Sequence, residues 1–162
     1  MARLKQNGLD AEAFIIDNFK YEGHQLKKST DYNDIHNDID ATHQTLGAVS
    51  IKSQSSRFFN FAVEVRQENS DDDMDFIDGW FKTGIAPYYI LAIRDKGRII
   101  EAHLISKSKL VKLINRTKPR DVRSWNAMKD NIDRRYDLPV VKLISLKYMK
   151  RQGVILETFK YE

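Results

Sequence analysis

Cysteine is absent from this 162-residue chain. Disulfides and cysteine-ligated zinc or iron–sulfur sites are therefore excluded, which favours a reduced, intracellular setting. No apolar stretch approaches the roughly 20 residues that cross a bilayer. No apolar run follows the positive charges near the N-terminus either, so we expect neither a membrane span nor a secretory signal. Together these absences predict a cytoplasmic location.

Several motifs that identify common enzyme classes are also absent. The chain contains no GxxxxGK[ST] or GxGxxG loop to bind a nucleotide and no GxSxG turn to present a nucleophilic serine. Its four histidines are scattered and lack the HExxH spacing of a zinc site. Carboxylates and lysines therefore remain as the side chains most able to carry chemistry.

The charges are distributed unevenly along the chain. Residues 1–105 hold 12 Lys and Arg against 17 Asp and Glu, whereas residues 106–151 hold 14 Lys and Arg against 4 Asp. So basic a segment attracts polyanions and indicates nucleic acid as a partner. A solvated helical face is the alternative explanation of the same lysines.

Hydrophobic periodicity predicts one α/β domain over residues 1–162. Its core covers about residues 8–114, a basic extension covers 115–162, and a central mixed sheet is flanked by helices. The helices expected from apolar spacing and capping are 9–21, 71–81, 106–115 and 125–135. The strands expected from alternation and β-branched or aromatic content are 39–46, 48–53, 58–66, 88–93, 98–105 and 139–146.

Acidic side chains and one lysine occur on the first three predicted strands. Asp38 and Asp40 stand at the entrance to the first strand, Lys52 on the second and Glu64 on the third. If these strands are neighbours, the side chains converge at one end of the sheet. Carboxylates that hold Mg²⁺ beside a lysine suit phosphodiester hydrolysis. A cross-strand ion pair between Glu64 and Lys52 is the structural alternative.

The arrangement of these residues resembles the pattern of the PD-(D/E)XK nuclease superfamily, especially that of its small phage-type and Holliday-junction-resolvase-type members. Glu12 in the opening helix, Asp40 at a strand start and Lys52 match the family's acidic positions and lysine over about residues 8–114. The resemblance implies a restriction-endonuclease-like fold and a metal-dependent deoxyribonuclease that acts as an endonuclease, with a phage as one option for its source. It implies Mg²⁺ or Mn²⁺ as cofactor, DNA as partner and a homodimer as one option.

The sequence departs from the family pattern two residues before Lys52, where Ser50 replaces the usual acid. Some members have Ser-x-Lys there and supply the carboxylate from another element. Glu64 is the predicted substitute, so that Asp40 and Glu64 would ligate the metal while Lys52 positions the water. If Glu64 is not a ligand, Asp38 and Glu12 are the next candidates.

The resemblance also leaves the substrate contacts and one alternative function open. The residues expected to contact substrate are Gln54, Arg66, Lys107, Lys109 and Lys112. A nuclease-derived protein that has lost catalysis and only binds nucleic acid is the alternative. Metal binding and product formation distinguish these two functions.

Overall fold

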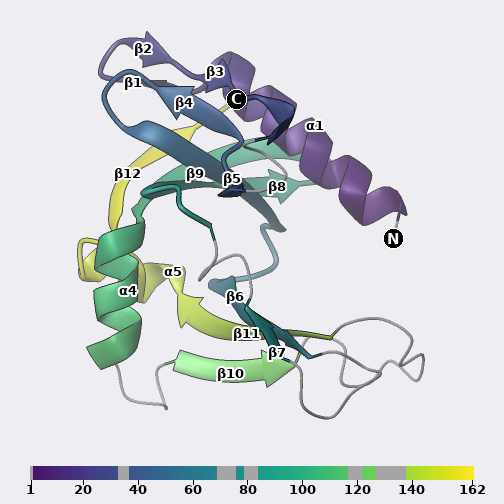
Figure 1. Cartoon of the computed structure of the whole chain (residues 1–162). Coiled ribbons are helices and arrows are strands. Elements are labelled where there is room, and N and C mark those ends of the chain that lie inside the picture. The colour runs from purple at the N-terminus through teal and green to yellow at the C-terminus, as the bar shows by residue number, and fades with distance from the viewer. Residues whose placement is uncertain (1, 33–36, 69–75, 79–83, 117–121, 127–137) are drawn as a thin grey trace.

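The computed structural model describes residues 2–32, 37–68, 76–78, 84–116, 122–126 and 138–162. Its largest sheet has six strands in the order β12-β9-β8-β5-β4-β3, and the parallel pair β5–β8 makes this sheet mixed (Figure 1). The strands are β3 (Lys27–Lys28), β4 (Ala41–His43), β5 (Gly47–Ser55), β8 (Tyr88–Asp95), β9 (Arg98–Ser106) and β12 (Ile155–Lys160).

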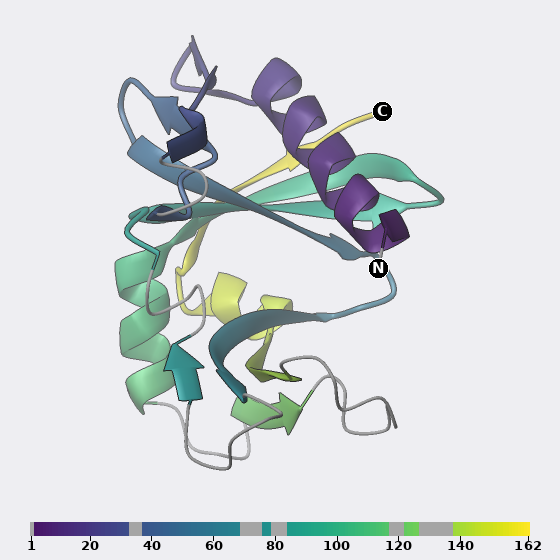
Figure 2. The same cartoon turned by 45° about the vertical axis from the view of Figure 1, so that its right-hand side comes forward.

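A second sheet has four strands in the order β10-β11-β6-β7. They are β6 (Asn60–Glu68), β7 (Phe76–Asp78), β10 (Val122–Asn126) and β11 (Leu138–Ser145), and a separate short pair joins β1 (Lys20–Tyr21) to β2 (His24–Gln25). The helices are α1 (Ala2–Asn18), α4 (Lys107–Arg116) and α5 (Leu146–Arg151). Figures 1 and 2 show α1 across one face of the six-stranded sheet, with α4, α5 and the second sheet beyond the opposite face.

Strand β8 is apolar along most of its length because both of its faces are buried. Ile90 and Ala92 pack with α1 residues such as Ile15, while Tyr89 and Leu91 pack toward α4. The sequence prediction of a strand buried on both faces is thereby confirmed. None of the described helices is long and apolar enough to cross a membrane.

The predicted single-domain α/β fold, with a mixed sheet and flanking helices, is confirmed. The hairpin of β8 and β9 and the basic helix α4 also match their predicted positions. Two predicted helices are wrong in part, because residues 76–78 form β7 and residues 125–126 belong to β10. The rest of both predicted helices lies outside the described residues. Strand pairing explains the difference, because β7 pairs with β6 and β10 pairs with β11, and such pairing overrides local periodicity.

The third predicted strand joins a different sheet from the second. Strand β6 pairs with β11 and β7, whereas β5 lies between β4 and β8. The expectation that the three strands are neighbours is therefore wrong for the third. Strand β11, one of the two partners of β6, pairs with residues that lie 70 to 85 positions earlier in the chain, which no local pattern indicates.

Candidate active site

The candidate site begins at the segment that leads into β4. The main chain of Asp38 has a φ of 53°, a left-handed conformation that aspartate adopts more readily than most other side chains. The amide of Asp40 donates a hydrogen bond of 3.0 Å to the carbonyl oxygen of Val49, which ties the entering segment to β5. Both aspartates are thus held against one end of β5.

Ser50 connects these two carboxylates. It is completely buried, and its hydroxyl lies 3.0 Å from Oδ2 of Asp38 and 3.3 Å from Oδ2 of Asp40. Oδ2 of Asp40 also accepts a hydrogen bond from the amide of Ile51. The two carboxylates therefore approach one hydroxyl. That hydroxyl belongs to residue 50, the position at which the PD-(D/E)XK pattern usually has an acid.

Lys52 lies on the same face of β5 as Ser50, because alternate residues of a strand share a face. Its Nζ lies 2.6 Å from Oδ1 of Asp38. The structure therefore gives Asp38 as an ion-pair partner of Lys52. This contact places Lys52 beside both aspartates.

The pKa of Asp40 is raised to about 7, chiefly because burial disfavours the charged carboxylate. The amide of Ile51 and the ammonium of Lys52 lower this pKa, whereas the charges of Asp38 and Glu12 raise it further. Glu12 is half-buried on α1. The predicted early acid thus acts electrostatically on Asp40, and the site holds excess negative charge that a cation would relieve.

Lys107 extends this site to the start of α4. Its Nζ donates a hydrogen bond to the carbonyl oxygen of Gly84 and lies 6.0 Å from the ring centroid of Tyr89. Burial lowers the pKa of Lys107, and the charge of Asp38 raises it. Tyr89 is paired with Ser50 in the sheet, and burial together with Asp38 raises its pKa. Lys107 therefore lies within electrostatic reach of Asp38.

The other predicted substrate residues are dispersed. Gln54 lies two residues beyond Lys52 on the same face of β5, and its Nε2 donates a hydrogen bond of 3.2 Å to the carbonyl oxygen of Phe58. Lys109 and Lys112 are exposed on α4. The backbones of Glu64 and Arg66 belong to β6 in the four-stranded sheet, and their side chains lie outside the described residues. The roles expected of these last two residues stay predictions.

The two aspartates fit a hard divalent cation. Within the described part of the chain, no group of three or more His, Asp or Glu is placed to hold a metal ion. Mg²⁺, however, is commonly held by one or two carboxylates and completes its shell with water and substrate phosphate. Asp38 and Asp40 supply such a pair, and carboxylate oxygen is the ligand type that Mg²⁺ and Mn²⁺ favour.

Asp38 is a residue that the sequence hypothesis placed behind Glu64 as a metal ligand. Its signal was the Asp-x-Asp spacing, which brings both acids to the same strand entrance. The resemblance favoured Glu64 because that residue stands on an apparent neighbouring strand. The side-chain contacts in the structure show that Asp38 reaches Ser50 and Lys52 directly.

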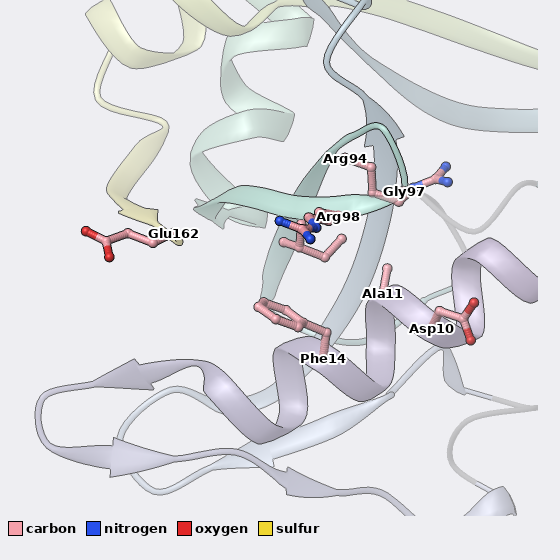
Figure 3. A pocket seen from close by; sticks show the side chains of 8 residues that line it. Asp10, Ala11, Phe14, Arg94, Gly97, Arg98 and Glu162 are labelled. Carbon is pink, nitrogen blue, oxygen red and sulfur yellow. The ribbon is translucent and has the colours of Figure 1, made fainter.

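A separate cavity of about 370 Å³ lies between α1 and the β8–β9 hairpin. Figure 3 shows Ala11 and Phe14 pointing from α1 toward the hairpin, with the carboxylate of Glu162 directed away from it. Arg94 lines this cavity and pairs with Ser55, which is five residues, or roughly 17 Å, along β5 from Ser50. The cavity therefore lies at the other end of β5 from the carboxylates.

No family model, curated protein or solved structure matches this chain. Function must therefore be argued from the geometry around Ser50.

Proposed function

We propose that this protein is a metal-dependent deoxyribonuclease, an endonuclease that hydrolyses phosphodiester bonds with Mg²⁺ or Mn²⁺ inside the cell. The observation that carries the proposal is the convergence of Asp38, Asp40 and Lys52 around the buried hydroxyl of Ser50. Two hard carboxylates and a lysine are groups that suit metal-assisted phosphodiester hydrolysis.

Asp38 and Asp40 would hold the ion, so Asp38 takes the place that the sequence hypothesis gave to Glu64. The bound ion would polarise a phosphoryl oxygen and acidify a water molecule. Asp40 must be ionised to ligate a metal, and its pKa of about 7 lets it lose its proton near neutral pH. Glu12 adds negative charge on the α1 side and favours cation binding further.

Lys52 has two tasks in this scheme. Without metal, its ammonium is the counterion of Asp38. With a metal ion held by Asp38 and Asp40, Lys52 would orient the attacking water and offset the negative charge that develops at phosphorus. Lys107 lies at the same site and supplies a further cation for the substrate phosphate.

The exposed lysines of α4 would hold the DNA backbone. Lys109 and Lys112 are exposed on the helix that begins with Lys107. Contacts from lysine to phosphate give affinity without reading sequence. We therefore expect the enzyme to bind many DNA sequences with similar affinity.

Incubation with supercoiled plasmid, with Mg²⁺, Mn²⁺ or EDTA, tests the proposal. The wild type should nick plasmid only with metal, and Lys52→Ala should abolish nicking. Lys160→Ala, which removes an exposed lysine from β12, is the matched control and should cut normally. DNA binding without metal-dependent cleavage would instead favour a nucleic-acid-binding protein that lacks catalysis.

A further inference from the structure

Two consecutive phenylalanines project into solvent between β5 and β6. Phe58 is 64% exposed and Phe59 is 80% exposed. An aromatic side chain gains roughly 1.5–3 kcal/mol from burial, so two exposed neighbours forgo a considerable stabilisation. Adjacent exposed aromatic rings indicate a surface that binds a partner.

The two rings form part of a cavity of about 460 Å³. Ile93 of β8, Ile100 of β9 and Leu146 of α5 also line it. This volume is within the range of pockets that bind small organic groups. A flat, apolar group in this cavity could therefore contact both phenylalanines and an aliphatic surface.

This cavity adjoins the polar face of β5. Gln54 hydrogen-bonds to the carbonyl oxygen of Phe58 and pairs in the sheet with Ile93, which lines the cavity. Lys52 is two residues from Gln54 along β5, a distance of about 7 Å. That separation equals about two steps of the 3.4 Å rise between stacked bases. A strand held at Lys52 can therefore reach the cavity with a nearby base.

Charge around the cavity suits a polyanion. Lys147 lines the cavity, and Arg57 is exposed directly before Phe58. Glu101 also lines the cavity, where its Oε1 lies 2.8 Å from Nε2 of His103. Lys147 and Arg57 thus offer two cations near the cavity for the phosphates of a bound strand.

We propose that Phe58 and Phe59 stack on unpaired bases next to the scissile phosphate, which makes nucleic acid with a single-stranded segment the preferred substrate. Bases within an intact duplex are already stacked on one another and cannot offer their faces to the rings, whereas unpaired bases can. This inference rests on the proposed nuclease function, and it adds the class of substrate.

Binding in EDTA tests this inference separately from catalysis. Fluorescence anisotropy would compare a single strand and a duplex of about 20 nucleotides, longer than the site of a typical single-strand-binding fold. The double variant Phe58→Leu/Phe59→Leu keeps apolar side chains but removes both rings. Its affinity for the single strand should fall about tenfold or more, with duplex affinity nearly unchanged. Phe58→Trp/Phe59→Trp should restore single-strand binding. Leu9→Ala, at an exposed position of α1 on the opposite face of the sheet, is the control and should bind as the wild type does.

Each other result has a definite meaning. If the leucine variant binds single strands as tightly as the wild type, or loses duplex affinity equally, the stacking inference is overturned while the nuclease proposal stands. If the wild type binds neither probe, nucleic acid is not the partner and both proposals fail. Thermal unfolding of each variant establishes that a loss of affinity does not come from a loss of fold.

Discussion

The ammonium of Lys52 lies 2.6 Å from the carboxylate of Asp38, and both side chains are about one-fifth exposed, at 21% and 22%. The same carboxylate lies 3.0 Å from the Ser50 hydroxyl, which also approaches Asp40. Lys52 is therefore the resident counterion of a carboxylate pair. A divalent cation that enters the pair must compete with this ammonium.

Metal binding should depend on both aspartates. Asp38→Asn and Asp40→Asn each remove one charged ligand and should weaken Mn²⁺ binding at least about tenfold, measured by calorimetry. Asparagine also tolerates the left-handed conformation at residue 38, so the fold should persist. Asp17→Asn, on an exposed position of α1, is the control and should bind Mn²⁺ normally. If the wild type and all three variants bind Mn²⁺ with equal affinity, the two aspartates do not bind the metal.

The affinity for Mn²⁺ should increase with pH through neutrality. Asp40 has a pKa of about 7, and its proton competes with the metal for the carboxylate. Below pH 7, affinity should fall by up to about tenfold for each pH unit, because one proton must leave on binding. Titrations at pH 6 and pH 8 measure this dependence. A pH-independent affinity would show that Asp40 is not a ligand.

The same pKa predicts a pH dependence of stability without metal. Because the folded-state pKa of Asp40 is raised from 3.8 to about 7, the folded state holds an extra proton between those values. The free energy of unfolding should therefore decrease as pH rises through this window. Urea unfolding in EDTA at pH 5 and pH 8 should show this decrease in the wild type and a smaller one in Asp40→Asn. The same decrease in both proteins would contradict the assignment.

A carboxylate introduced at residue 50 should make stability depend on metal. Ser50→Asp places a third acid at a completely buried position beside Asp38 and Asp40. Repulsion between like charges should lower the melting temperature in EDTA, and Mn²⁺ should raise it more than in the wild type. Ser50→Ala lacks the added charge and serves as the control. If Mn²⁺ raises the melting temperature of Ser50→Asp no more than that of the wild type, residue 50 does not lie beside the bound metal.

The exposed lysines of α4 should determine the salt dependence of DNA binding. Lys109→Ala and Lys112→Ala should each weaken binding to all sequences alike. Each should also lower the slope of log affinity against log salt by roughly 0.9 if it removes one phosphate contact. Lys160→Ala on β12 is the control for general loss of positive charge. Unchanged slopes would show that α4 presents its lysines to solvent only.

Local patterns predicted the elements that hold the site but not all of their neighbours. The apolar run of β8 and the capped basic helix α4 are encoded in consecutive residues, and so is the convergence of Asp40 with Lys52 across the hairpin of β4 and β5. The sheet that contains Glu64 could not be predicted, because β6 finds its partner in the distant β11. The terminal strand β12, which pairs with β9, was missed for the same reason.

The initial rate of plasmid nicking in Mn²⁺, compared between Asp38→Asn and Glu64→Gln, tests the central claim most directly. With Asp38 and Asp40 as the metal-binding pair, Asp38→Asn should lower the rate by roughly 100-fold or more, as loss of a group that stabilises developing charge does. Glu64→Gln should stay within a few-fold of the wild type, because the proposed pair of metal ligands does not include Glu64. Full activity in Asp38→Asn together with loss of activity in Glu64→Gln would contradict the account.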